Sequence, residues 1–281
     1  MTALPIKIAR RIRRRIDITF FAASADCFLV SYPKSGRTWF RFLLSHYFAA
    51  RSAPGTDVDL HNMFGVLPNF DLDPVRGVPA FRFGGRGKDV PRIWVSHLAF
   101  RRSLFLNKPA IMLVRDPRDV AVSSYFHATR HKHRFEGDIE QFLEDPSQGV
   151  PAMCAYLNGW AKGIAGRRSH ILSYEALSAD PASQVAGALK FLGCAVDEGA
   201  VEAAVRAGSF AAMQKRELAE GLPAHDYDRS DNESLRMRRG QAGGYTDYLS
   251  PAMVSKVEEI CRRNLTLGAK ALLAETGVSL S

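Results

Sequence analysis

A tight turn between two apolar segments is the part of the sequence best suited to chemistry. Residues 27–32 (Cys-Phe-Leu-Val-Ser-Tyr) predict a buried strand, residues 33–36 (Pro-Lys-Ser-Gly) break it, and residues 37–50 predict a helix. In such a strand–turn–helix unit, free backbone N–H groups and the positive end of the helix dipole point into the turn. The turn therefore predicts a phosphate site, to which Lys34 adds a positive charge.

A second candidate anion site follows the apolar run 110–114. Arg115 stands directly after this run, and we expect a helix from about Pro117, because Asp116 can cap it and proline favours a first helical turn. Ser123 then falls about two turns into the helix, on the side that can face Arg115. A guanidinium fork donates two hydrogen bonds to phosphate. Taken alone, the same residues also fit a helix start with a surface salt bridge.

The elements around these two sites predict one α/β domain. Residues 92–96 and 169–174 predict further strands, and helices are expected at 151–166, 181–192, 197–207 and 251–268. Strands that alternate with helices predict a central parallel sheet, doubly wound and flanked by helices. We expect a basic N-terminal segment over residues 1–20 and the domain over 21–281. Residues 52–90 and 215–247 have no sustained period, and we expect them to be functional loops that shape a pocket.

The composition limits the kinds of partner. The chain of 281 residues is 46% hydrophobic and 24% charged, as in ordinary globular proteins, and its net charge of +9 suits an anionic partner. Four widely scattered cysteines do not support a zinc site or a disulfide framework. The sequence contains no apolar stretch long enough to cross a membrane and no clean signal peptide, which predicts a cytoplasmic protein.

Residues 4–18 predict an amphipathic helix. Leu4, Ile8, Ile12 and Ile16 recur every four residues, and six basic residues fill the other faces: Lys7, Arg10, Arg11, Arg13, Arg14 and Arg15. Such a helix can lie on an anionic bilayer as a peripheral contact, or it can pack its isoleucines onto the domain. The sequence leaves both interpretations open.

The turn also carries a resemblance. Residues 32–39 (Tyr-Pro-Lys-Ser-Gly-Arg-Thr-Trp) are similar to the loop Y-P-K-S-G-T-T-W, with which sulfotransferases bind the 5′-phosphosulfate of 3′-phosphoadenosine 5′-phosphosulfate (PAPS), and they differ from the ATPase P-loop. The resemblance implies that Lys34 stabilises the departing phosphate oxygen. It implies that backbone N–H groups of Ser35, Gly36, Arg37 and Thr38 hold the 5′-phosphate and that Trp39 offers a face to the adenine. Arg37 replaces the usual first threonine of the loop.

Other segments resemble the same family in the same order along the chain. Residues 115–123 (Arg-Asp-Pro-Arg-Asp-Val-Ala-Val-Ser) resemble its 3′-phosphate signature, residues 172–177 its Y-E-D-L segment, residues 209–213 its S-F-x-x-M segment and residues 238–243 its late R-K-G-x-x-G loop. The further residues that the resemblance assigns to the nucleotide are Arg115, Ser123, Tyr174, Ser209, Phe210, Arg238, Arg239 and Gly240.

A histidine is the candidate base. Residues 95–98 (Val-Ser-His-Leu) resemble the T-H-L-P segment, whose histidine takes the acceptor's proton, although Ala99 stands in place of the proline. Imidazole suits this role because it titrates near neutral pH. Other branches of the family use a glutamate, and a structural role for His97 at a strand end is the alternative.

The resemblance implies a sulfotransferase with a P-loop-like nucleotide-binding fold. Such an enzyme moves a sulfuryl group from PAPS to a hydroxyl or amine and releases adenosine 3′,5′-bisphosphate, without a metal. The implied acceptor is a small molecule, a lipid or a glycan, and not a nucleic acid. Two alternatives stay open: a nucleotide-dependent kinase, and a basic module that binds membrane or nucleic acid. A kinase would normally supply a Walker lysine and magnesium ligands, which the sequence does not offer.

Overall fold

Four parallel strands form the centre of the molecule. The computed structural model describes residues 3–83, 90–222, 227–231, 234–235, 237 and 240–278, with the side chains of residues 3–12 and 15 outside this description. The strands are β1 (Cys27–Ser31), β2 (Ile93–Ser96), β3 (Ala110–Val114) and β4 (Ser169–Ser173). They lie in the order β2-β1-β3-β4, and every neighbouring pair is parallel. This confirms the predicted α/β fold with a parallel sheet.

The strand order places one position of the sheet in a special role. From β1 the chain moves first to β2 on one side and then to β3 on the other, so the connections diverge beside β1. In open parallel sheets, ligands bind at the carboxyl ends of the strands where the connections diverge. Lys34 follows β1 and Arg115 follows β3, and Ser31 pairs with Leu113 in the register of these strands. The topology therefore brings the two predicted anion sites to the same edge.

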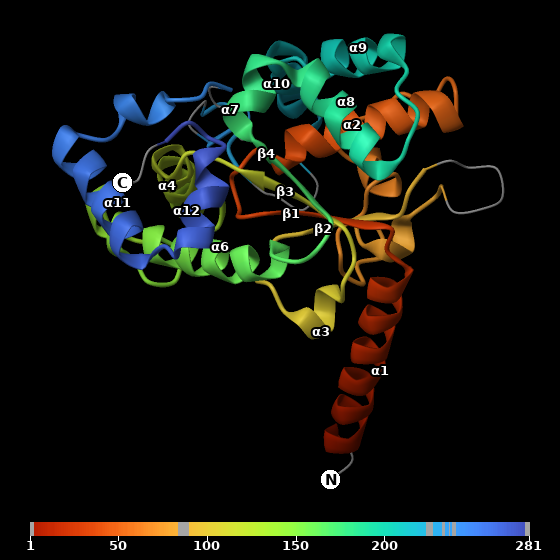
Figure 1. The fold of residues 1–281 in the computed structure, drawn as a ribbon, viewed down its shortest axis with the longest axis horizontal. Helices are drawn as coiled ribbons and strands as arrows, with labels where there is room; N and C mark the ends of the chain where they lie inside the picture. The colour runs from red at the N-terminus through yellow and green to blue at the C-terminus, as the bar shows by residue number, and fades with distance from the viewer. Residues whose placement is uncertain are drawn as a thin grey trace.

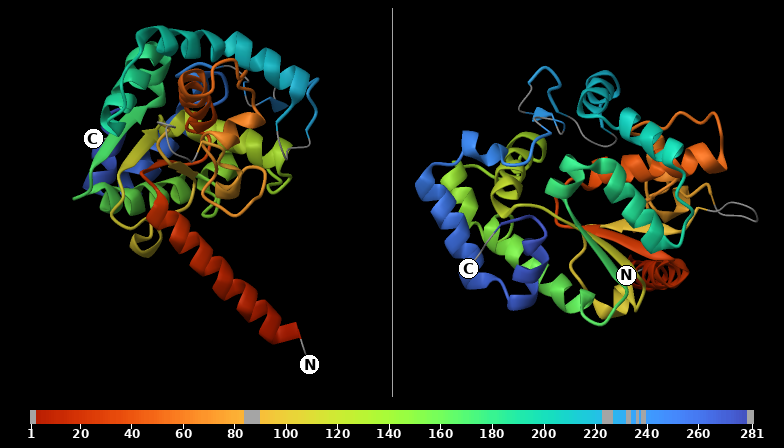
Figure 2. Two further views of the ribbon diagram at one scale, coloured as in Figure 1. Left: turned by 90° about the vertical axis from the view of Figure 1, so that its right-hand side faces the viewer. Right: turned by 45° about the horizontal axis from the view of Figure 1, so that its top comes forward.

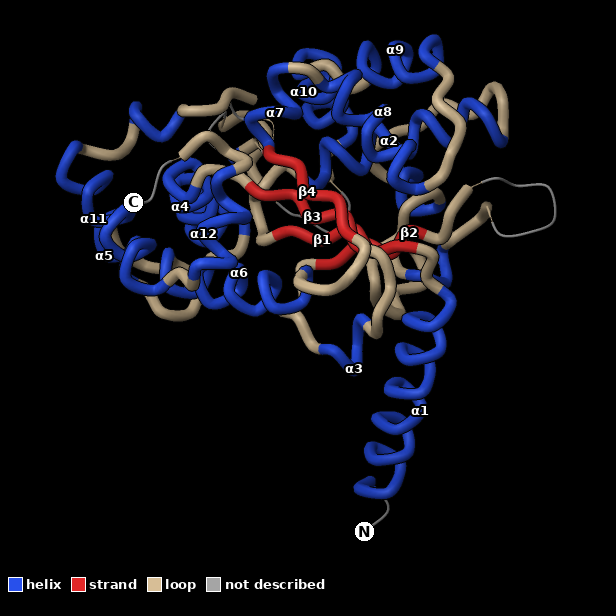
Figure 3. Tube along the Cα trace, in the orientation of Figure 1, coloured by secondary structure: helices blue, strands red, loops and turns tan. Residues whose placement is uncertain are grey.

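Helices cover both faces of the sheet, as Figures 1 and 3 show. The α-helices are α1 (Ala3–Ser24), α2 (Arg37–Ser52), α3 (Arg102–Phe105), α4 (Pro117–Phe126), α5 (Ile139–Glu144), α6 (Val150–Ile164), α7 (Tyr174–Ala179), α8 (Pro181–Leu192), α9 (Glu198–Ala207), α10 (Phe210–Glu220), α11 (Pro251–Asn264) and α12 (Leu267–Ala274). Short helical turns occupy η1 (Asn62–Gly65), η2 (Val78–Ala80), η3 (His127–His131) and η5 (Gly244–Asp247).

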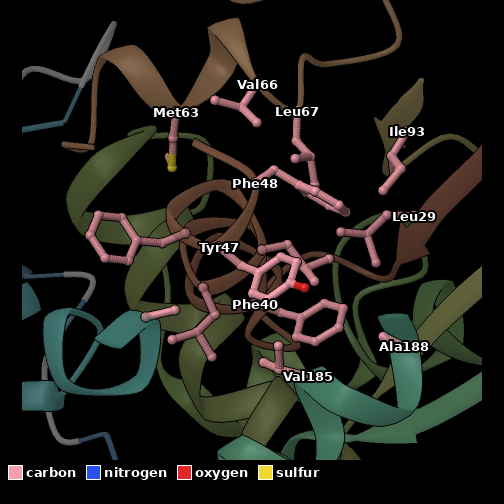
Figure 4. Packing of buried hydrophobic residues seen from close by; sticks show 14 of the residues in the cluster. Leu29, Phe40, Tyr47, Phe48, Met63, Val66, Leu67, Ile93, Val185 and Ala188 are labelled. Atoms are coloured by element: carbon pink, nitrogen blue, oxygen red, sulfur yellow. The ribbon is translucent and has the colours of Figure 1, made fainter. Parts of the chain in front are cut away.

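The strands divide the core into two layers because successive side chains point to opposite faces. Leu29 and Ile111 face a layer covered by α2, α8 and α9, part of which Figure 4 shows around Phe40 and Tyr47. Phe28 and Met112 belong to the other layer, which α4, α6, α11 and α12 cover. Because these strands are buried on both faces, they appear in the sequence as continuous apolar runs.

The predicted helix 251–268 is wrong in one respect, because it is two helices. α11 ends at Asn264, and Thr266 caps α12 by accepting a hydrogen bond from the Ala269 N–H. Asn158 of α6 holds the break: its side chain donates to the Asn264 carbonyl oxygen at 2.7 Å and accepts the Thr266 N–H at 2.8 Å. A side chain distant in sequence thus satisfies the backbone groups at the break.

Part of the stretch 52–90 forms backbone hydrogen bonds with the edge strand β2. The Phe70 N–H donates to the Val95 carbonyl oxygen at 2.8 Å, and the Val95 N–H donates to the Pro68 carbonyl oxygen at 3.0 Å. Leu60, Met63 and Leu67 are buried in the core beside α2. Among the helices that the structure describes, none is both long enough and apolar enough to cross a membrane.

Candidate functional site

The turn after β1 is shaped by two residues in the left-handed backbone region. Lys34 has φ 71° and Gly36 has φ 90°. A Cβ at Gly36 would lie 2.5 Å from Cδ2 of the Tyr174 ring, so only glycine fits against this ring. Gly36 is also the N-cap of α2, and its cap position carries no side-chain hydrogen bond. The first N–H groups of α2 are therefore not capped by a side chain at that position, as a site for phosphate requires.

A cavity of about 1250 Å³, its open mouth included, lies beside this turn. Its described lining comes from the turn, the carboxyl ends of β2 and β3, α4, η3, α10 and the late glycine-rich loop. The lining residues are Lys34, Gly36, Arg37, Thr38, Trp39, His97, Arg115, Asp119, Val122, Ser123, Phe126, His127, His131, Tyr174, Gly208, Phe210, Met213, Leu235, Met237, Gly240, Gln241 and Gly244.

Arg115 links the turn to the late glycine-rich loop. Its Nη1 donates to the Lys34 carbonyl oxygen at 3.2 Å, and its Nη2 donates to the Gln241 carbonyl oxygen at 3.3 Å. The guanidinium also lies 4.1 Å from the centre of the Tyr174 ring and 3.3 Å from the Asp119 carboxylate. One partly buried arginine thereby fixes three walls of the cavity.

Asp119, like Arg115, binds the backbone of the late glycine-rich loop. Its carboxylate is almost fully buried and accepts the Gly243 N–H at 2.8 Å and the Tyr245 N–H at 2.9 Å. Ser123 lies one turn further along α4 and lines the cavity. Arg238 and Arg239 lie outside the described residues, whereas Gly240 lines the cavity.

Part of the cavity lining is aromatic. The Trp39 indole N–H donates to the Gly208 carbonyl oxygen at 2.8 Å, and its ring meets that of Tyr174 edge-on at 5.9 Å. Phe210 packs on Gly240, where a Cβ would lie 2.1 Å from the ring. These three rings give the cavity aromatic surfaces, the kind of surface on which a nucleobase stacks.

Two predicted site residues lie outside the lining. Ser209 caps α10 by accepting the Ala212 N–H, and Ser35 is buried inside the turn.

Burial raises the pKa of Tyr174, which the Arg115 charge opposes, and burial likewise raises the pKa of Glu175. The Glu175 carboxylate accepts the Asp116 N–H at 2.9 Å and so steadies the backbone between β3 and α4.

His97 sits at the carboxyl end of β2 with its ring fixed. Its Nδ1 lies 2.8 Å from the Ser31 carbonyl oxygen. A carbonyl only accepts hydrogen bonds, so Nδ1 carries the proton and the lone pair of the neutral ring is on Nε2. The next residue is held as well, because the Leu98 N–H donates to Ser96 Oγ and the Trp160 indole donates to the Leu98 carbonyl. This arrangement leaves a positioned imidazole at the cavity.

Two further histidines line the same cavity, which the sequence did not predict. His127 and His131 lie on η3 with ring centres 5.2 Å apart, and Tyr227 packs on His131 at 4.7 Å. Both histidines follow Ser123, by four and eight residues, on the helix that the sequence predicted. Side chains at this spacing share one face of a helix, and this spacing could have identified them. The stretch 52–90 was expected to shape this pocket, but none of its described residues is in the lining.

A buried carboxylate of α10 binds two residues of the loop that follows this helix, Tyr227 and Met237. Glu217 of α10 is fully buried, accepts the Tyr227 hydroxyl at 2.8 Å and accepts the Met237 N–H at 2.8 Å. Gln214 donates to the Met237 carbonyl oxygen at 2.9 Å. Both polar groups of the Met237 peptide unit are therefore tied to α10, and Met237 itself lines the cavity.

Comparison with known proteins places this site in a family. Residues 24–269 match the sulfotransferase domain family. The chain is 25% identical to a 3-alpha-hydroxysteroid sulfotransferase of Cavia porcellus, with 90% of this chain and 88% of the relative covered. It is 28% identical to cytosolic sulfotransferase 17 of Arabidopsis thaliana, with 85% and 74% covered.

Solved structures share the fold. The mouse sulfotransferase SULT7A1 complexed with PAP (adenosine 3′,5′-bisphosphate) superimposes with a TM-score of 0.64 at 21% identity, over 90% of both chains. Retinol dehydratase in complex with androsterone and PAP gives a TM-score of 0.60 at 20% identity, over 95% of this chain and 87% of that one. Since the family match spans most of the sequence, the chain belongs to the sulfotransferase family, whose enzymes move a sulfuryl group from PAPS to an acceptor.

Proposed function

We propose that this sulfotransferase transfers a sulfuryl group from PAPS to a hydroxyl or amine of a small molecule, in one step within the cavity described above. The observation that carries the proposal is the meeting of Lys34, His97 and Arg115 at one cavity from the ends of three neighbouring strands. Membership of the family decides against a kinase and against a binding module without activity.

The residues fit the nucleotide in two halves. In our proposal the turn 34–38, at the start of α2, holds the 5′-phosphate. Arg115, Ser123 and Gly240, together with Arg238 and Arg239, hold the 3′-phosphate. Trp39, Tyr174 and Phe210 enclose the adenine, and Ser209 contributes by setting the start of α10 beside Phe210. The cationic and hydrogen-bonding lining supports this division because PAPS is a polyanion.

Lys34 acts on the bond that breaks. When the sulfuryl group leaves, the bridging oxygen of the phosphate gains negative charge. The ammonium of Lys34 would stabilise that charge more in the transition state than in the ground state. The positive φ of Lys34 supports this role, because a strained backbone held by its surroundings aims a side chain at a functional site.

His97 acts on the acceptor. With Nδ1–H bound to the Ser31 carbonyl, Nε2 is the atom that can accept the acceptor's proton. The charge formed on the ring would then be stabilised by that carbonyl, as in other sites where an oxygen orients a catalytic imidazole. The proton leaves the acceptor as its oxygen or nitrogen bonds to sulfur, so the enzyme needs no covalent intermediate.

We propose an apolar alcohol or phenol as the acceptor, rather than a glycan. Val122, Phe126, Leu235 and Met237 supply apolar lining to the cavity. Relatives named for steroid sulfation and for complexes with retinol or androsterone support this class.

Radiolabelled PAPS provides the test. The full chain is incubated with 35S-PAPS and with 2-naphthol, a steroid alcohol or an aminosugar oligosaccharide, and labelled product is counted. We expect transfer to the apolar alcohols, and a loss of several orders of magnitude in kcat for Lys34→Ala, with bisphosphate binding within about tenfold of the wild type. Lys162→Ala, on the helix α6, is the matched control. Undiminished kcat in Lys34→Ala would contradict the role of Lys34, and labelling of the oligosaccharide alone would contradict the acceptor class.

A further inference from the structure

The helix α1 leaves the body of the domain. Figures 1 and 2 show it running outward from the domain toward the N-terminus. Its last turns are anchored: Ala22 is fully buried, and the Trp94 indole donates to the Phe21 carbonyl oxygen at 2.7 Å. With 22 residues, α1 is about 33 Å long, far longer than this anchor needs.

The outward part of α1 exposes large apolar side chains. Ile16 is 62% exposed and Phe20 is 70% exposed, and four residues apart they lie on the same face. In sequence this face continues toward the N-terminus at the same spacing through Ile12, Ile8 and Leu4. The described part of the stripe is therefore not packed onto the domain, contrary to the surface-helix alternative.

The other faces of α1 concentrate positive charge. Residues 1–24 contain six basic residues and one acidic residue, Asp17, a net +5 out of the chain's +9. Arg13 and Arg14 are exposed. Several of the basic residues are four apart, such as Arg10 and Arg14, a spacing that disfavours an isolated helix by repulsion. A nearby anionic surface removes this repulsion.

One partner satisfies both sides of the helix. A second copy of α1 could cover the apolar stripe, but it would bring a second set of like charges beside the first. A nucleic acid could neutralise the charge, but it would leave the isoleucines and the phenylalanine in water. An anionic bilayer accepts the apolar stripe at its headgroup boundary and pairs its lipid charges with the arginines.

We propose that α1 docks this enzyme onto anionic membrane surfaces, lying in the plane of the interface with Ile16 and Phe20 inserted. This proposal is independent of the sulfuryl-transfer site, because no described residue of α1 lines the cavity.

Co-sedimentation of the full-length protein with vesicles tests the proposal. The vesicles contain phosphatidylcholine alone, or phosphatidylcholine with about a third phosphatidylserine. We expect binding to the anionic vesicles, little binding to the neutral ones, and weaker binding at high salt because salt screens the arginines. Ile16→Ser/Phe20→Ser should lower the partition coefficient at least about tenfold, given the apolar area withdrawn from the bilayer. Arg13→Gln/Arg14→Gln should lower it and weaken its dependence on salt.

Matched controls separate docking from general stickiness. Leu267→Ser removes an apolar side chain that is 86% exposed elsewhere, and Arg262→Gln/Arg263→Gln removes two adjacent exposed arginines on α11. Both should bind like the wild type, and all variants should keep the wild-type thermal shift with adenosine 3′,5′-bisphosphate. The proposal is overturned if the wild type ignores anionic vesicles or if the α1 variants bind like the controls. It is also overturned if light scattering shows that Ile16 and Phe20 serve instead to pair two copies.

Discussion

The imidazole Nδ1 of His97 lies 2.8 Å from the backbone carbonyl oxygen of Ser31, a contact between the ends of two neighbouring strands. The contact fixes both the orientation and the tautomer of the ring. His97→Gln should therefore lower kcat/KM for a phenol acceptor by about 10²–10⁴-fold, the usual contribution of a positioned base.

His127→Gln is the control for this prediction, since His127 lines the same cavity from α4's continuation. We expect it to change the acceptor KM more than kcat. A crippled kcat in His127→Gln together with a nearly normal His97→Gln enzyme would reassign the base.

Gly36 should tolerate no side chain. Alanine there must adopt a positive φ, which costs about 1–2 kcal/mol, and its Cβ would meet the Tyr174 ring at 2.5 Å. Gly55 has nearly the same φ, 87°, and open space around it, so Gly55→Ala isolates the backbone cost. Gly36→Ala should lose more thermal stability and most of its affinity for adenosine 3′,5′-bisphosphate. Equal effects at the two positions would show that the Tyr174 contact is unimportant.

Glu217 should affect binding of the sulfuryl acceptor although it does not line the cavity. Glu217→Ala leaves the Tyr227 hydroxyl and the Met237 N–H without their acceptor, at about 1–3 kcal/mol for each group. Glu217→Gln keeps one acceptor oxygen and should retain more. With 2-naphthol we expect the acceptor KM to rise severalfold in both variants while bisphosphate affinity stays close to normal. Glu220→Gln, on the same helix and partly exposed, should match the wild type in both measurements.

How far the sequence predicts this molecule depends on the range of the interactions involved. The placement of Lys34 and Arg115 could be predicted because each lies within three residues of the end of an apolar strand, and parallel strands bring their ends to one edge. Asp119, Glu217 and His131 could not, because their roles depend on tertiary contacts with a later part of the chain. Asp119 accepts from Gly243, 124 residues further on, His131 packs against Tyr227, 96 residues further on, and Glu217 accepts from Tyr227, 10 residues further on. The break between α11 and α12 could not be predicted from the sequence for the same reason, because Asn158 stabilises it from another helix.

Glu175 should make stability depend on pH in a particular direction. Burial raises its pKa, so the folded state prefers the protonated carboxyl. That preference is fully present below the unfolded pKa and is lost as the pH rises through the folded pKa. Glu175→Gln cannot titrate, and its side-chain oxygen can still accept the Asp116 N–H. Denaturant unfolding should show the Gln variant gaining stability relative to the wild type as the pH rises above 4.5. A difference that stays constant or shrinks over this range would mean that Glu175 is not held in an unfavourable charged form.

The central claim is that the cavity holds the nucleotide by its two phosphates, and calorimetric titration with adenosine 3′,5′-bisphosphate in the absence of magnesium tests it most directly. Ser123→Ala should weaken binding by about 10–100-fold, the usual effect of one hydrogen bond to a charged group. Ser124→Ala, the neighbour on α4 that is not in the lining, should bind normally. Adenosine 5′-monophosphate lacks the 3′-phosphate, so the wild type and Ser123→Ala should bind it equally. No binding of the bisphosphate to the wild type, or the same loss for Ser123→Ala with both nucleotides, would contradict the account.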